Sequence, residues 1–168
     1  MGILMSETFN SLDDVFHHEL KDLYDAEQRI LKALPQMAEK AHNPNLKRAF
    51  EKHRQQTEKH VQRLESVFEH RGLEPEGIKC HGIVGIISEG SDILSADGDC
   101  DAIDAALIGA AQKVEHYEMA SYGTLRTFAE HLGDNYSVEL LQQTLDEEKE
   151  TDYKLTEIAE AKVNPASV

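Results

Sequence analysis

The sequence predicts an all-α protein in which four long helices pack as a bundle. Apolar residues recur at alternating spacings of three and four along four long stretches, which is the pattern of amphipathic helices. Short polar turns separate the first stretch from the second and the third from the fourth. A chain of 168 residues can bury a sizeable core, so we expect a single domain over residues 1–168.

The first two helices are expected over residues 10–41 and 44–71. Ser11 is a suitable N-terminal cap, because two aspartates follow it in the first turn. A turn at residues 42–45 separates the two helices, and Gly72 ends the second one. Because this turn is short, the two helices are expected to form an antiparallel hairpin.

Residues 72–101 break the helical pattern with several glycines, and an apolar piece at 83–94 predicts one short helix there. The third and fourth long helices are expected over residues 101–132 and 135–161, as a second antiparallel hairpin. The tail from residue 163 onward is expected to fray. Two hairpins joined by one long crossover have the topology of ferritin-like four-helix bundles.

Six acidic or histidine side chains occupy helix positions that the surrounding periodicity reserves for Leu, Ile, Phe or Val. They are Glu27, His53, His60, Glu118, Glu148 and Asp152. Folding the first hairpin about its turn places Glu27 level with His60. Folding the second places Glu148 level with Glu118, and Glu115 projects the same way from one turn earlier. We therefore expect one buried polar layer near the middle of the bundle.

Burying these side chains is costly unless something balances their charge. A buried carboxylate costs several kcal/mol, whereas a whole domain is stable by only about 5–15 kcal/mol. The apolar faces carry no Lys or Arg, so a bound metal is the economical counter-charge. Oxygen-rich ligand sets favour iron or manganese over zinc. We expect two ions, held by Glu27, His53, His60, Glu115, Glu118, Glu148 and Asp152.

The second helix leaves two interpretations open. His53 lies about 10 Å along the helix axis from His60, too far for both to bind one ion. It is either a ligand or a hydrogen-bonding partner of a ligand. Gln56 faces the same side, whereas Glu147 falls off the buried face and is expected on the solvated surface. Three tyrosines near the layer are expected to pack with their hydroxyls hydrogen-bonded: Tyr24, Tyr117 and Tyr122.

The composition argues against several classes of partner. The 32 acidic residues outnumber 17 Lys and Arg, and the net charge of −15 repels nucleic acid and anionic lipid. No stretch approaches the roughly 18–20 apolar residues of a membrane span, and no secretory leader is visible. Two cysteines far from the helix centres suit a reduced compartment, so a cytoplasmic location is expected.

Several segments carry a family resemblance. The most specific is Ala111-Gln112-Lys113-Val114-Glu115-His116-Tyr117-Glu118, followed by Ala120-Ser121-Tyr122-Gly123-Thr124-Leu125. Others are Leu145-Asp146-Glu147-Glu148-Lys149 and Asp13-Asp14-Val15-Phe16. With them the chain resembles the YciE/YciF family of bacterial stress-associated proteins, closest to its YciF branch. The resemblance implies a ferritin-like four-helix bundle, a homodimer and a two-metal carboxylate site, with no firmly assigned reaction.

The chain departs from the ferritin-like pattern in its second helix. Di-iron proteins of this fold usually carry Glu-x-x-His on two helices, and neither buried face here has it. The one such pair, Glu39 and His42, lies at a helix end. Relatives tend to have Glu where this chain has Gln56. These departures argue against a symmetric di-iron centre.

Two functions stay open from the sequence. The first is a stress-response protein whose two metal ions react with a small oxidant such as oxygen or peroxide. The second is a non-enzymatic structural or interaction bundle, in which protonated carboxylates form a metal-free polar network. Storage of metal in a cage is disfavoured, because nothing in the sequence indicates cage symmetry.

Overall fold

The computed structural model describes residues 7–167, and over this range the chain is helical and contains no strand. The elements are α1 (Leu12–Lys40), α2 (Pro44–His70), α3 (His81–Leu94), α4 (Cys100–His131), α5 (Asn135–Ile158), a π-helical turn (Ala159–Val163) and α6 (Asn164–Ala166). The predicted all-α class is confirmed, and the observed bounds lie close to the expected ranges. The short helix predicted inside the crossover is α3.

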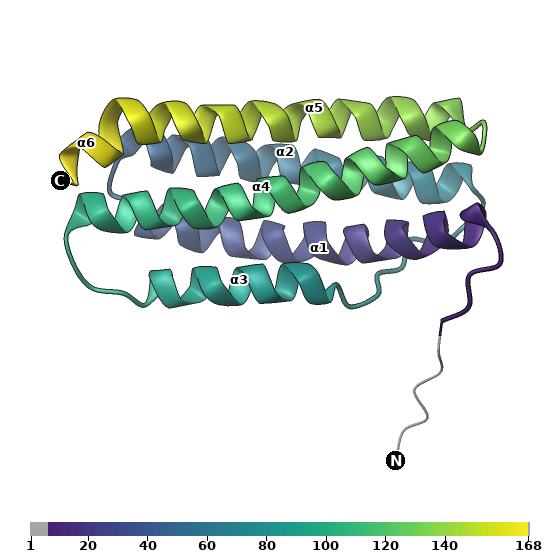
Figure 1. Cartoon of the computed structure of the whole chain (residues 1–168), viewed down its shortest axis with the longest axis horizontal. Coiled ribbons are helices and arrows are strands. Elements are labelled where there is room, and N and C mark those ends of the chain that lie inside the picture. The colour runs from purple at the N-terminus through teal and green to yellow at the C-terminus, as the bar shows by residue number, and fades with distance from the viewer. Residues whose placement is uncertain (1–6, 168) are drawn as a thin grey trace, which may run out of the picture.

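Local signals start and stop the long helices. The Oγ of Ser11 accepts the N–H of Asp14 at 3.1 Å, and the Asp14 carboxylate accepts the N–H of Ser11 at 3.0 Å. Gly72 and Gly133 have φ angles of 69° and 73°, the left-handed conformation in which glycine ends a helix. As Figure 1 shows, α1 and α2 run antiparallel, as do α4 and α5.

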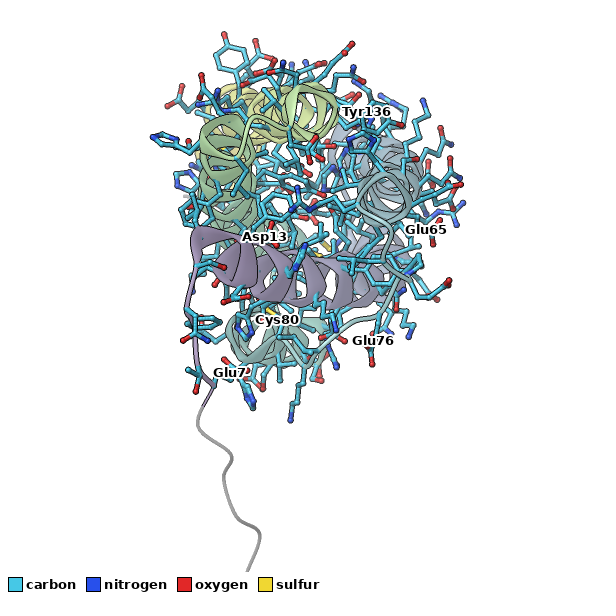
Figure 2. All side chains as sticks on the ribbon, turned by 90° about the vertical axis from the view of Figure 1, so that its right-hand side faces the viewer. Glu7, Asp13, Glu65, Glu76, Cys80 and Tyr136 are labelled. Carbon is cyan, nitrogen blue, oxygen red and sulfur yellow. The ribbon has the colours of Figure 1, made fainter. Side chains whose placement is uncertain are left out.

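The long helices pack side by side around a common interior. α1 contacts α2 and α4, and α5 contacts the same two helices. α3 lies along α1 and α4, on the side of the molecule opposite α5 (Figures 1 and 2). The largest fully buried side chains include Phe16, Leu20, Leu64, Phe68, Leu107, Tyr122 and Leu141. Within residues 7–167 no helix is both long and apolar enough to cross a membrane.

Two carboxylates near the ends of the helices connect one hairpin to the other. Asp104 on α4 accepts the backbone N–H groups of His42 and Asn43 at 2.9 and 2.5 Å, in the turn between α1 and α2. At the opposite end of the long helices, the Asp134 carboxylate accepts a hydrogen bond from the guanidinium of Arg71 at 2.8 Å. These contacts join the two hairpins at both ends of the long helices.

The end of the chain differs from the expectation. Fraying was predicted from Val163 onward, but Val163 is fully buried and the helical path continues through α6. The physical reason is the spacing of Leu155, Ala159 and Val163, which repeats every four residues and extends the apolar face of α5. This extension packs against α4.

Candidate metal centre

Six ionisable side chains meet near the middle of the long helices. They are Glu27 on α1, His53 and His60 on α2, Glu115 and Glu118 on α4, and Glu148 on α5. None is more than 2% exposed. All six belong to the layer predicted from the sequence. We call them the layer residues.

The first group joins α1, α2 and α5. The Nδ1 atom of His60 lies 3.5 Å from a carboxylate oxygen of Glu27 and 2.9 Å from one of Glu148. Each of the three residues offers one ligand atom, and these atoms lie within 4.8 Å of one another. The predicted pairing of Glu27 with His60 is therefore present, and it forms a cluster that can hold a metal ion.

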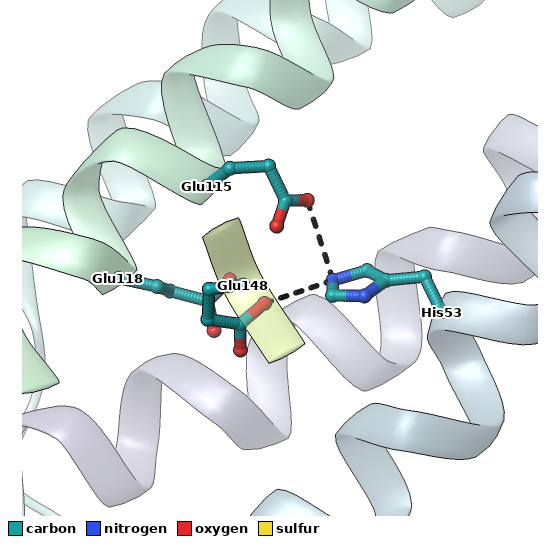
Figure 3. A group of neighbouring side chains, drawn as sticks. All are labelled: His53, Glu115, Glu118 and Glu148. Atoms are coloured by element: carbon teal, nitrogen blue, oxygen red, sulfur yellow. Dashed lines mark ion pairs between the residues drawn. The ribbon is translucent and has the colours of Figure 1, made fainter. Parts of the chain in front are cut away.

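The second group joins α2, α4 and α5. The Nε2 atom of His53 lies 3.3 Å from a carboxylate oxygen of Glu115 and 3.8 Å from one of Glu148 (Figure 3). Glu118 completes this group, again with the ligand atoms within 4.8 Å of one another. Glu148 belongs to both groups. The structure thus places His53 among possible ligands, in a different group from His60.

The outer nitrogen of His60 is held by a charged pair. Its Nε2 lies 2.8 Å from the carboxylate of Glu147, which receives two hydrogen bonds from Arg63 at 2.8 and 2.9 Å. The Arg63 hydrogen bonds, followed by His60, lower the pKa of Glu147 to about 2 against the opposing effect of partial burial. A neutral His60 that donates from Nε2 presents the lone pair of Nδ1 to the first group.

This contact corrects the prediction that Glu147 is a solvated surface residue. Glu147 is half-buried and bridges α5 to α2. The apolar periodicity of α5 alone could not predict this contact, because the partners of Glu147 lie on α2. The available signal was Arg63, placed three residues after His60 on the same side of its helix.

The outer nitrogen of His53 has a weaker partner. Its Nδ1 lies 3.3 Å from the hydroxyl of Thr151. That hydroxyl donates its proton to the Glu147 backbone carbonyl at 3.0 Å, so it accepts a hydrogen bond from Nδ1. Burial, the largest influence, lowers the pKa of His53 and favours the neutral ring. The two histidines of α2 are therefore supported differently, one by a charged pair and one by a hydroxyl.

Asp152 is the one predicted ligand that the structure leaves outside both groups. Its side chain is 23% exposed, and its carboxylate lies 3.2 Å from both the Gln112 amide and the His116 ring. It sits one turn beyond Glu148, at the edge of the α4–α5 contact rather than inside the bundle. Gln56 is half-buried and also belongs to neither group.

The tyrosines near the layer hydrogen-bond as predicted. The Tyr122 hydroxyl is fully buried and donates to Glu27. Tyr24 donates to Glu65 at 2.9 Å, and Tyr117 donates to Asp22 at the same distance. Tyr122 is the only one of the three that touches a layer residue through its hydroxyl.

Eight buried polar atoms of the described chain have no hydrogen-bond partner, and all eight belong to the layer residues. They are Oε2 of Glu27, Nε2 of His53, Nδ1 of His60, Oε2 of Glu115, and both carboxylate oxygens of Glu118 and Glu148. Buried polar atoms are nearly always partnered in proteins. Every exception between residues 7 and 167 is thus concentrated at one place and consists of typical metal-ligand atoms.

Burial and mutual repulsion shift the proton affinities in the layer. Burial, then the charge of Glu148, raises the pKa of Glu115 and of Glu118 well above the usual range. Burial also raises the pKa of Glu27. Burial opposes the charge of His60, but the carboxylates of Glu148 and Glu27 outweigh it and raise its pKa to about 10. Protons and metal ions therefore compete for the same atoms.

Comparison with known proteins agrees with the resemblance of the sequence. Protein YciF of Escherichia coli (strain K12) is 43% identical over 155 residues, covering 92% of this chain and 93% of that protein. The crystal structure of the E. coli stress protein YciF matches with a TM-score of 0.89 and 43% identity, over 93% of this chain and 99% of that chain. The structure of YcfI from Rhodopseudomonas palustris matches with a TM-score of 0.87 and 40% identity, over 91% and 98%.

A family model gives the same assignment over almost the whole length. The model described as Domain of unknown function (DUF892) matches residues 11–167, which include helices α1 to α6 and every layer residue. By this match, and by its identity to YciF, the chain belongs to the DUF892 family, the family of the YciF-like proteins.

Proposed function

We propose that this protein is a ferritin-like, four-helix metalloprotein of the bacterial stress response that holds two iron or manganese ions in its buried layer. One observation carries the proposal: all eight unpartnered buried polar atoms of residues 7–167 lie on the layer residues. Leaving so many such atoms without a cation is costly. The description of the E. coli relative YciF as a stress protein supports the physiological setting.

The two groups suit two ions that share one ligand. Glu27 and His60 would hold one ion, and His53, Glu115 and Glu118 the other, with Glu148 common to both. Ferritin-like and related bundles build two-metal sites from carboxylates and histidines on facing helices in the same manner. Five of the seven ligands predicted from the sequence are carboxylates, and four of those lie in the two groups.

Bound iron or manganese would supply redox chemistry toward a small oxidant such as oxygen or peroxide. Neighbouring side chains orient the ligand residues and bury them. Arg63 and Glu147 hold the ring of His60, and the Tyr122 hydroxyl donates to Glu27. The layer residues are at most 2% exposed, so bulk water has little access to them.

The second candidate is a metal-free structural or interaction bundle. Its supporting observation is the raised pKa of Glu115 and of Glu118, which burial, then the charge of Glu148, holds well above the usual range. Neutral carboxyl groups need no cation, and a charged His60 beside Glu147 and Glu148 would balance the rest. The two candidates differ in their response to metal.

Elemental analysis of the purified protein tests the proposal. Protein from cells grown with added iron or manganese should carry about two ions per chain, and the Glu27→Ala/Glu148→Ala variant below about 0.2. Glu150→Ala is the matched control, because Glu150 is an exposed glutamate of α5 that pairs with Lys52 at 3.2 Å. Wild-type protein with fewer than about 0.2 ions per chain would favour the metal-free candidate.

We further propose a homodimer in the bacterial cytoplasm. The dimer is implied by the resemblance to the YciE/YciF family, and the two free cysteines, Cys80 and Cys100, suit a reducing compartment. A native mass of two chains at micromolar concentration supports the dimer, and a mass of one chain contradicts it.

A further inference from the structure

A cavity lies between α3 and the α1–α4 pair. Its volume is ≈ 380 Å³, within the range of about 300–1,000 Å³ that small-molecule sites occupy. Its walls are mostly apolar, with contributions from all three helices: Ala33, Met37, Ile87, Leu94, Ala110 and Val114. Several of these side chains are only half-buried.

The cavity reaches the candidate metal centre. His53 and Glu115 line it, and both are 2% exposed. The Nε2 of His53 and the Oε2 of Glu115 are among the buried atoms without a hydrogen-bond partner in the described chain. The apolar walls therefore lead to two polar atoms of the second group, whereas Glu27 and His60 of the first group do not line the cavity.

Two glycines of α3 show where the space lies. A Cβ at Gly82 would meet the Tyr117 ring at 2.7 Å, so α3 and α4 approach closely there. A Cβ at Gly90, which lines the cavity, would find only the Cβ of Ala110 within range, at 3.9 Å. The second half of α3 thus leaves room beside α4 that side chains of the described residues do not fill.

We propose that this cavity is the substrate pocket of the metal centre and that it binds an uncharged, apolar molecule, one end of which reaches His53 and Glu115. This inference rests on the proposed function. The chemical class of the ligand follows from the apolar walls of the cavity, because a charged group among apolar side chains would lose its hydration without gaining a partner. An anionic end near His53 would also face the carboxylate of Glu115.

The residues at the rim agree with an uncharged ligand. Arg29 lines the cavity, but its guanidinium already makes two hydrogen bonds to Asp25, at 2.5 and 3.1 Å. Lys32 is exposed at the surface, where water solvates its charge. The cavity therefore offers an incoming carboxylate or phosphate no buried counter-charge, and apolar burial is the main source of affinity.

A fluorescent probe tests the proposal on the full-length protein. N-phenyl-1-naphthylamine is uncharged and apolar, and it should bind saturably to wild-type protein both after chelator treatment and with Mn²⁺ added. Decanol should displace it better than decanoate or decylamine. Gly90→Phe should abolish binding, because the ring occupies the space beside Ala110.

Gly85→Phe is the matched control. Gly85 lies on the same helix, lines no part of the cavity, and has nothing within 4 Å of an added Cβ. Both changes replace a helical glycine and should raise helix propensity alike. Thermal unfolding of both variants checks that each is folded. Unchanged probe binding in Gly85→Phe beside loss in Gly90→Phe supports the proposal.

Several results would overturn it. These are no saturable probe signal in wild type, equal loss in both variants, or better displacement by decanoate or decylamine than by decanol. A dimer that dissociates in Gly90→Phe while wild type binds no probe would identify the cavity as a self-association surface. An Mn²⁺ affinity that decanol leaves unchanged would separate the cavity from the metal centre.

Failure of the proposed function gives a different result. A protein that binds no metal, yet loses the probe only in Gly90→Phe, would retain the apolar pocket and refute the metal centre.

Discussion

The two groups of the buried layer share Glu148 but differ in what surrounds them. In the first group, the outer nitrogen of His60 contacts Glu147, which Arg63 holds in place. In the second, the outer nitrogen of His53, Nδ1, lies 3.3 Å from the neutral hydroxyl of Thr151. His53 and Glu115 of the second group also line the apolar cavity, whereas Glu27 and His60 of the first group do not. The histidine of one group is thus held by a charged pair away from the cavity, whereas the histidine of the other has a weaker partner and lies beside the cavity.

This difference suggests a division of labour within one site. A histidine supported by a charged pair loses little freedom on binding metal, so the first group favours firm retention. A group beside a cavity can meet a second molecule without rearrangement of the helices. Four predictions test or refine the comparison, from the largest expected effect to the smallest.

Glu148→Ala should have the largest effect, because Glu148 belongs to both groups. We expect iron or manganese content to fall by more than about tenfold, since each ion loses a ligand and the layer loses its shared carboxylate. Elemental analysis measures this, with Glu150→Ala as the control. Retention of one full ion would indicate that the two groups bind metal independently of Glu148.

Added metal should stabilise the protein strongly. A metal that binds only the folded state at about 100 times its dissociation constant stabilises it by about 2.7 kcal/mol. Unfolding in urea with Mn²⁺, and again with excess chelator, measures the difference. Identical unfolding curves with Mn²⁺ and with chelator would favour the metal-free bundle. Variants of the first group should lose more of this stabilisation than variants of the second.

Glu147→Ala tests the support of His60. Removing such an outer partner typically weakens metal binding by about 10- to 100-fold. Thr151→Val removes the corresponding partner of His53, which is a longer contact to a neutral hydroxyl, so its effect should be smaller. Competition with a metal indicator measures both affinities. Equal losses in the two variants would remove the distinction between the halves.

Asp134→Asn tests a carboxylate outside the layer, one that accepts hydrogen bonds from Arg71 and Ser137. Burial raises the pKa of Asp134, but hydrogen bonds from Ser137 and Arg71 outweigh burial and lower it below its usual value. The carboxylate therefore adds stability above the unfolded pKa, and this is lost as the pH falls through the folded pKa. At pH 7 the variant should be less stable by about 1–2 kcal/mol.

Urea unfolding at several pH values measures this effect. The difference between Asp134→Asn and wild type should shrink as the pH falls below about 4. Metal content should be unchanged, because Asp134 lies at the end of the bundle and contacts no layer residue. A loss of metal would mean that the end of the bundle sets the geometry of the layer.

The residues of the layer could be predicted because burial in a helix depends on local spacing. Glu27, His60 and Glu148 occupy positions that continue an apolar face, and short turns set the level at which facing helices meet. Asp152 satisfied the same two criteria, yet it lies at the edge of the bundle. The turns predict how far along the bundle axis a residue lies, but they do not predict how its helix is rotated about its own axis. That rotation decides which face of the helix is buried between the other helices.

The sequence by itself determined the helices, the two hairpins and the burial of acids and histidines near their middles, because periodicity and turn residues act over a few positions. Only the tertiary structure decided that these side chains divide into two groups, that Glu147 reaches His60, and that a cavity opens onto His53. Each of these depends on how α2, α3 and α5 are rotated and spaced against their neighbours. Such contacts join residues far apart in the chain, and packing of the whole core sets them.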